Sequence, residues 1–118
     1  MSKERPELPG IIKPRTTEIE GFQNKTIRPI IKMQHALLIA FITNYFEKRK
    51  IVYPSLSEEK KKLKIKSILE KDIQFRNMVL GSIIGHFSMD EYVYYIISAS
   101  EMNKRIIQIT IQRFQDSL

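Results

Sequence analysis

The chain has 118 residues, a formal net charge of +7 and no cysteine. Its length fits one domain with a single hydrophobic core, and a composition of 42% hydrophobic and 28% charged residues excludes a wholly disordered chain. The lack of cysteine excludes disulfides, thiolate catalysis and cysteine-based zinc sites, and it is consistent with a reducing compartment.

The sequence gives no reason to expect contact with a membrane. The first residues contain no apolar signal segment, and the longest apolar run, 36–42, is far too short to cross a bilayer. We therefore expect a soluble, cytoplasmic protein.

Two parts of the chain differ in character. Residues 1–15 are predicted to form an extended N-terminal arm, because Pro6, Pro9 and Pro14 prevent a regular helix and push the residues before them toward extended conformations. Residues 16–118 are predicted to form one all-α domain of four to five helices, packed as a bundle or at steep angles.

A helical piece near 17–25 precedes a longer predicted helix that ends near Lys48. Pro29 fits the first turn of that helix, with Thr26 as a candidate cap. Apolar residues at helical spacing cover roughly half of its circumference, which predicts a central position in the domain. On one side lie Ile31, Leu38, Ile42, Tyr45 and Phe46.

Later helix starts are indicated by three Ser-x-x-Glu sequences, in which the serine caps the helix and the glutamate reaches back to it. They begin at Ser55, Ser88 and Ser98. They predict helical structure over 56–86, in one or two helices, then a short helix over 89–97 and a last helix from Ser100. Residues 92–97 also have high strand propensity, but a lone strand has no partner to pair with.

Basic residues concentrate between 48 and 66, where eight of them stand against two acids. Such a segment can bind a phosphate backbone or an acidic protein, and a solvated helix face is the simpler alternative. The candidate partner-binding residues are Lys48, Arg49, Lys50, Lys60, Lys61 and Lys64.

The candidates for a small-molecule or metal site are His35, His86, Tyr92 and Tyr95. No His-x-x-x-His or Glu-x-x-His spacing places two metal ligands on one helix face. A partly buried structural histidine at position 35 and a helix-end role at position 86 are the simpler interpretations. We therefore assign no catalytic residue, metal or cofactor.

Two patterns predict self-association. Gly81 and Gly85 lie one helical turn apart and allow another helix to approach closely, within the chain or from a second subunit. The last helix carries apolar stripes over roughly 200° of its circumference, more than one neighbour normally buries. Ile107, Ile111 and Phe114 belong to its second stripe and are candidate interface residues.

Three groups of residues carry a resemblance to a known family. They are Phe22-Gln23-Asn24 with Arg28-Pro29-Ile30-Ile31-Lys32 and Gln34-His35, then Gly85-His86-Phe87 with Glu91-Tyr92, then Met102-Asn103-Lys104-Arg105-Ile106. The sequence resembles a family of short bacterial proteins of unknown function, some of which are called glyoxalase-like. The resemblance implies a single domain after the arm. The glyoxalase name implies a βαβββ metalloenzyme with His and Glu ligands on strands. This sequence has two histidines and no series of strands, so no catalytic residue is carried over.

Together these patterns predict a non-enzymatic helical interaction module that forms a homo-oligomer through apolar helix faces. Two alternatives stay open. The first is nucleic-acid binding through the basic segment 48–66, and the second is small-molecule or metal binding around His35 and His86.

Overall fold

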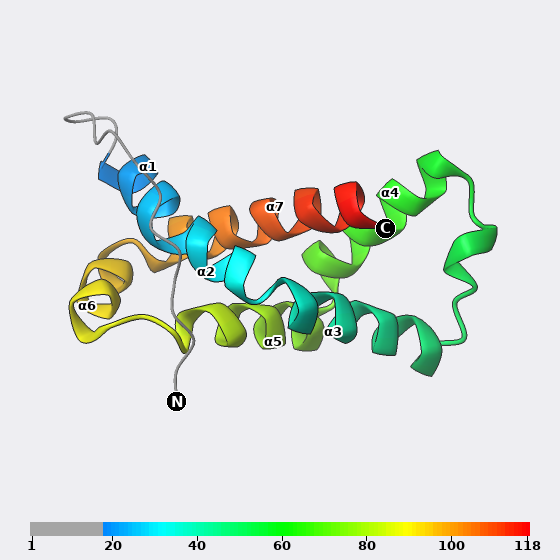
Figure 1. Cartoon of the computed structure of the whole chain (residues 1–118), viewed down its shortest axis with the longest axis horizontal. Helices are drawn as coiled ribbons and strands as arrows, with labels where there is room; N and C mark the ends of the chain where they lie inside the picture. Colours follow the sequence, from blue (N-terminus) through cyan, green and yellow to red (C-terminus); the bar gives the residue numbers. More distant parts are fainter. Residues whose placement is uncertain (1–17) are drawn as a thin grey trace.

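The computed structural model describes residues 18–118, and all of the regular structure in that range is helical (Figure 1). The predicted arm, 1–15, lies outside the described residues. The elements in chain order are α1 (Glu18–Phe22), the π-helical η1 (Gln23–Ile27), α2 (Arg28–Met33), α3 (His35–Lys48), the 3-10 turn η2 (Tyr53–Ser55), α4 (Glu58–Lys71), α5 (Ile73–Ile84), α6 (Met89–Ile97) and α7 (Ala99–Ser117).

The all-α prediction is confirmed, but the predicted number of helices is too low. Since α1, η1 and α2 follow one another without a break, they form one helical stretch, and residues 18–118 then hold six helices. The prediction was four to five. The additional helix arises because the chain breaks at Gln34, where no glycine or proline signals a break.

The molecule is elongated, with extents of 45 × 33 × 25 Å. Helix α7 packs against α4, α5, α6 and η1. Figure 1 shows α6 at one end of the long axis and the connection between α3 and α4 at the other. No helix within residues 18–118 combines the length and apolar character needed to span a membrane.

The long helix predicted to end near Lys48 is divided at Gln34, whose φ and ψ of −92° and 10° leave the helical range. The buried Gln34 side chain donates from Nε2 to the Ser82 carbonyl oxygen of α5, at 3.2 Å. Pro29 lies in the first turn of α2, as predicted, but Thr26 is not its cap. Instead, the Thr26 hydroxyl donates to Glu91 Oε2, at 3.3 Å.

Two of the three predicted helix starts need correction. The start at Ser55 is wrong, because 53–55 form a 3-10 turn and Ser57 caps α4 by accepting from the Lys60 amide. At Ser88 the complete capping box is present, and α6 has the predicted bounds. Ser98 does precede α7, but its side chain makes no capping hydrogen bond. The open question over 56–86 is answered by two helices, α4 and α5, joined at Asp72.

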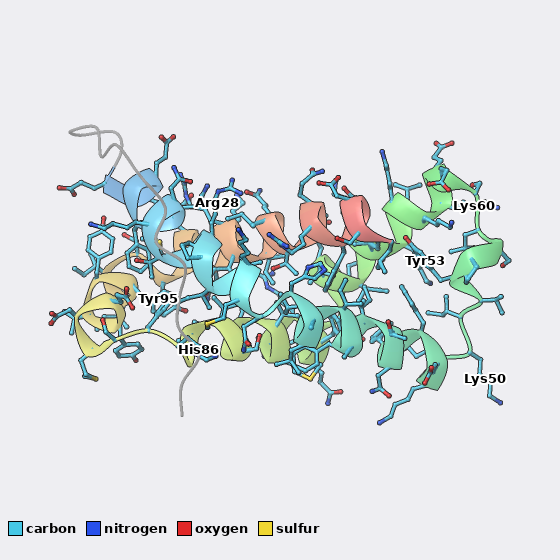
Figure 2. The ribbon with its side chains drawn as sticks, in the orientation of Figure 1. Arg28, Lys50, Tyr53, Lys60, His86 and Tyr95 are labelled. Carbon is cyan, nitrogen blue, oxygen red and sulfur yellow. The ribbon has the colours of Figure 1, made fainter. Side chains whose placement is uncertain are left out.

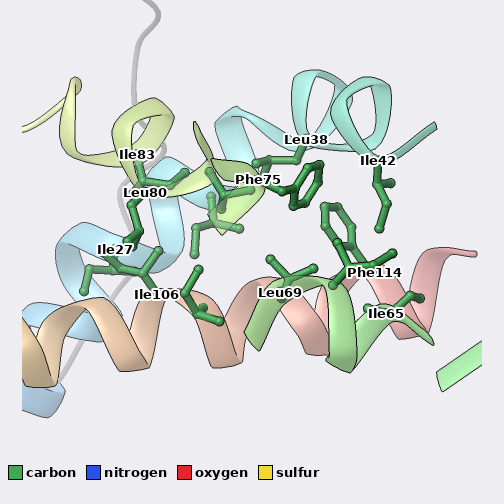
Figure 3. Packing of buried hydrophobic residues seen from close by; sticks show 14 of the residues in the cluster. Ile27, Leu38, Ile42, Ile65, Leu69, Phe75, Leu80, Ile83, Ile106 and Phe114 are labelled. Atoms are coloured by element: carbon green, nitrogen blue, oxygen red, sulfur yellow. The ribbon is translucent and has the colours of Figure 1, made fainter. Parts of the chain in front are cut away.

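The core forms between α3, α4, α5 and α7, together with residues from η1 and α2 (Figure 3). The apolar side predicted for the first long helix is buried at Ile31, Leu38, Ile42 and Phe46. Both stripes of the last helix also contribute, because α7 has neighbours on more than one side. Among the wholly buried residues are Ile27, Ile65, Leu69, Ile83, Ile106 and Phe114.

Candidate functional site

The outer face of α6 is apolar and exposed to solvent. Five large side chains recur there at helical spacing, and each keeps between 43% and 76% of its surface accessible. They are Met89, Tyr92, Val93, Ile96 and Ile97. A helix at a protein surface normally turns such a stripe toward the core. In α6 the stripe faces solvent instead. We call these five residues the α6 face.

Hydrogen bonds fix the rotation of α6 about its axis. Glu91 Oε1 accepts from the Ser88 amide at 2.8 Å, while the Glu91 amide donates to Ser88 Oγ at 3.2 Å. The second oxygen of Glu91 accepts from the Thr26 hydroxyl. At the other end of the helix, the Tyr95 hydroxyl donates to Asn103 Oδ1 on α7. The bonds to Thr26 and Asn103 join α6 to other elements on its inner side, so the α6 face is directed outward.

Aromatic rings pack beneath the inner side of α6. The ring of Phe22 lies 4.9 Å from that of Tyr94 and 5.6 Å from that of Phe87, and Phe87 lies 5.5 Å from Tyr95. Burial and the nearby charge of Glu18 raise the pKa of Tyr94. Rotating α6 to bury its outer face would break this packing, so exposure of the α6 face follows from how the helix is anchored.

The stretch of sequence that contains α6 has no basic residue. No lysine or arginine occurs between Arg76 and Lys104, whereas Asp90, Glu91 and Glu101 fall within that range. Asp90 and Glu91 lie in the first turn of α6, where negative charge is favourable to the helix dipole. The sequence around α6 therefore combines apolar and acidic residues, and a lysine of another element, Lys25, lines a pocket together with Tyr94.

The predicted basic patch lies at the opposite end. Figure 2 shows Lys50 and Lys60 at the same end of the long axis, although ten positions separate them. Exposed members are Lys48, Arg49, Lys50 and Lys60, and half-buried members are Lys61 and Lys64. Within residues 18–118, two of the six form salt bridges: Arg49 pairs with Asp72 at 3.1 Å, and Lys61 pairs with Glu58 at 3.4 Å.

Asp72 is the centre of a polar cluster where α3 meets the joint between α4 and α5. Its carboxylate accepts from the Phe75 amide at 3.1 Å, from the Tyr45 hydroxyl at 2.8 Å and from Arg49. The Phe75 amide, the Tyr45 hydroxyl and the Arg49 charge lower the pKa of Asp72, in that order of importance. Burial and the bond to Asp72 raise the pKa of Tyr45. The cluster ties the C-terminal end of α3 to the turn between α4 and α5.

The predicted interface residues of α7 are largely occupied within the chain. Phe114 and Ile107 are 0% and 4% exposed, and Ile111 is half-buried. In this conformation Phe114 and Ile107 are unavailable to a partner. Gly81 lies exposed on α5 and Gly85 is the exposed residue that caps its C-terminus, and a Cβ added at Gly81 would meet no other atom within 4 Å. No helix of residues 18–118 therefore crosses closely over Gly81, and a role for the two glycines in an interface stays a prediction.

The four predicted ligand residues occupy different surroundings. His35 is half-buried, and its Nδ1 lies 3.1 Å from Arg113 Nη1. His86 is half-buried just after α5. Tyr92 is exposed and Tyr95 is buried, as expected for two tyrosines on one short helix. Among residues 18–118, no group of three or more His, Asp or Glu side chains is placed to hold a metal ion.

One feature near His35 was missed by sequence reasoning. Arg105 and Arg113 line the same groove on α7, and Arg28 of α2 joins them there. The spacing of eight residues between Arg105 and Arg113 indicates a shared helix face. Nothing in the sequence indicates that Arg28, far away in the chain, lies against that face.

No family model matches the chain, and comparisons with curated proteins and with solved structures find no match either. The resemblance to short bacterial proteins therefore stays a prediction.

Proposed function

We propose that this protein is a self-associating helical interaction module, in which the α6 face pairs with the same face of a second copy. The observation that carries the proposal is the exposure of five large apolar side chains on one side of a helix of nine residues. Exposed apolar patches of this kind on soluble proteins commonly mark interaction sites.

The size of the α6 face favours a weak, reversible dimer. Covering it on two copies would remove on the order of 1,000 Å² from water, near the lower limit of specific interfaces. Association also costs translational and rotational freedom, which leaves a modest net free energy. We therefore expect a dissociation constant in the micromolar range.

The charge distribution supports a second copy as the occupant. Contact through α6 places the two basic segments, 48–66, at opposite extremes of the dimer, because α6 and that segment lie at opposite ends of an axis of 45 Å. Charges so far apart are screened at physiological ionic strength, where the Debye length is about 8 Å. Pairing through the end that carries residues 48–66 would instead bring two basic segments together.

The test is sedimentation of full-length protein from micromolar to millimolar concentration, at low and high salt. We expect a monomer–dimer equilibrium that high salt leaves unchanged or strengthens, because burial of apolar surface drives it. Ile97→Glu should leave a monomer at all concentrations. Ile73→Glu is a matched control, because Ile73 is 70% exposed on α5 whereas Ile97 is 76% exposed on α6.

Two outcomes would contradict this proposal. The first is a wild-type protein that stays monomeric throughout the concentration range. The second is equal dissociation of the dimer by Ile97→Glu and by Ile73→Glu, since the α6 face would then have no special role.

A second candidate function is binding of an acidic partner or a nucleic acid by the basic end. The observation that favours it is the placement of Lys50 and Lys60 at one end of the molecule. Such binding should weaken steeply with salt, because counterions are released from phosphates. Charge reversal at Lys61, Lys64 and Lys66 should abolish it, and binding indifferent to salt and to these changes would exclude this function.

A further inference from the structure

A groove of about 460 Å³ runs between the η1–α2 segment and α7. Its lining is mostly polar, with Ile109 as an apolar member. Three arginines and three glutamines line it: Arg28, Arg105, Arg113, Gln23, Gln108 and Gln112. Grooves of this size hold small organic molecules, and arginine side chains favour ligands that carry phosphate or carboxylate groups.

Arg105 forms one wall of the groove and is held by two hydrogen bonds. Its Nε donates to Glu101 Oε2 at 2.8 Å, one turn earlier on α7. Its Nη1 donates to Gln23 Oε1 at 2.9 Å and thereby joins α7 to η1. Because Glu101 offsets the charge of Arg105, the main role of this arginine is to hold η1 against α7 beside the groove.

Arg113 has a different environment. It is half-buried, and its Nη1 donates to Nδ1 of His35 at 3.1 Å, since a guanidinium has no acceptor. Within residues 18–118 it forms no salt bridge with a carboxylate. A partly buried guanidinium has lost some of its hydration, and the imidazole of His35 carries no negative charge that could offset the charge of Arg113. An anionic ligand in the groove would supply the negative charge that Arg113 lacks in a partner.

Arg28 completes the positive surface from α2, and Figure 2 shows it where α2 passes α7. Its Nε donates to Asn24 Oδ1 at 3.1 Å, which orients the guanidinium. In the described part of the chain, Arg28 also lacks a salt bridge, so its two terminal nitrogens remain as donors for a ligand. Asp116 is a carboxylate in the lining, and Gln112 donates to it at 2.9 Å.

We infer that this groove binds a phosphate monoester with a polar organic body, in which Arg28 and Arg113 hold the phosphate. Two guanidiniums without carboxylate partners match the two negative charges of a phosphate monoester and can each donate bidentate hydrogen bonds to its oxygens. The groove is larger than a phosphate ion needs, and Gln23, Gln108 and Gln112 provide amide donors and acceptors for a sugar or a base. This inference is independent of the proposed pairing through α6.

The test is a nuclear magnetic resonance titration of full-length protein labelled with ¹⁵N. The probes are adenosine 5′-monophosphate and glucose 6-phosphate, with adenosine and glucose as matched probes without phosphate. We expect submillimolar binding of at least one phosphorylated probe, no binding of the other two, and shifts of the Gln23, Gln108 and Gln112 side-chain amides. Arg28→Gln and Arg113→Gln should each weaken binding by at least about tenfold.

Lys104→Gln is the control variant, because it removes one positive charge from α7 at an exposed position outside the groove lining. It should change the affinity by less than about threefold if contact rather than net charge drives binding. Arg28 is exposed, so Arg28→Gln is a test that does not risk the fold. Equal weakening by Lys104→Gln, equal binding of the probes without phosphate, no binding of either phosphorylated probe, or shifts confined to the basic segment 48–66 would each overturn the inference.

Discussion

Helices α6 and α7 follow one another directly in the chain and carry similarly wide apolar surface, yet they use it in opposite ways. In α7, Met102, Ile106 and Phe114 are all 0% exposed. In α6, Met89 and Ile97 are 75% and 76% exposed. The cause is position: α7 runs through the molecule beside α4, α5 and η1, whereas α6 lies at one end and is covered on its inner side alone.

The comparison shows what the width of an apolar stripe can and cannot indicate. A wide stripe indicates how much surface a helix can bury, but not whether the neighbour belongs to the same chain. The last helix was predicted to have surface left over for a partner, and the chain itself buries most of it. The surface left over lies on α6 instead, which moves the proposed contact between copies to that helix.

The largest loss of stability in the comparison between α7 and α6 is expected for a substitution of Phe114. Phe114→Ala should lower the free energy of unfolding by about 3–5 kcal/mol, because it removes a wholly buried ring and leaves a cavity. Ile97→Ala on α6 should change it by less than about 0.5 kcal/mol, as exposed positions usually do. Urea unfolding of dilute protein measures both. Similar losses for the two variants would show that α6 and α7 do not differ as described.

A smaller effect is expected at Asp72, where the chain turns so that α4 and α5 can both cover α7. Asp72→Ala should cost about 1–2 kcal/mol at neutral pH, because it removes the cap of α5. The pKa of Asp72 is lower in the folded protein than its ordinary value of about 3.9. Its charged form therefore stabilises the fold above about pH 4, and this contribution is lost as the pH falls through the folded pKa.

Urea unfolding of wild type and of Asp72→Asn between pH 7 and pH 2 measures this pH dependence. The asparagine keeps an oxygen that can cap the helix but has no charge to lose. The two proteins should differ in stability most at pH 7, and the difference should shrink as the wild-type carboxylate is protonated. A difference that stays constant over the whole range would contradict the assignment.

The smallest effect concerns the caps of the two helices. Ser88→Ala should cost about 1 kcal/mol and should speed hydrogen exchange of the α6 amides, because it removes the serine half of a complete capping box. Ser98→Ala should change stability by no more than a few tenths of a kcal/mol, because Ser98 makes no side-chain capping bond to α7. An effect of Ser98→Ala as large as that of Ser88→Ala would contradict the difference between the two caps.

Local signals predicted some elements well and failed where distant residues intervene. The bounds of α6 follow from the capping box at Ser88, which depends on residues three apart in the chain. The start predicted at Ser55 fails because the turn at Tyr53, whose ring is buried, delays the helix until after Ser57. The break at Gln34 has no local signal, because its side chain is tied to a carbonyl of α5.

The sequence also predicts the two candidate surfaces, the α6 face and the basic segment, only in part. The apolar spacing along 89–97 is visible in the sequence, and so is the lack of lysine and arginine around it. Its exposure is not visible, because it depends on which side of α6 is held by Thr26, Phe22 and Asn103. The basic segment is visible in the sequence as a run of charges, but the internal pairing of Arg49 with Asp72 is not.

The sequence by itself determined that this protein is helical, where the helix capped by Ser88 begins and which residues on each helix share a side. These properties depend on neighbours within a turn or two, and hydrogen bonding and helical spacing act over that range. Only the tertiary structure decided that the α7 stripes are buried, that the α6 face is exposed and that Arg28 joins Arg113 in one groove. Those outcomes depend on contacts between residues far apart in the chain, which helix packing alone brings together.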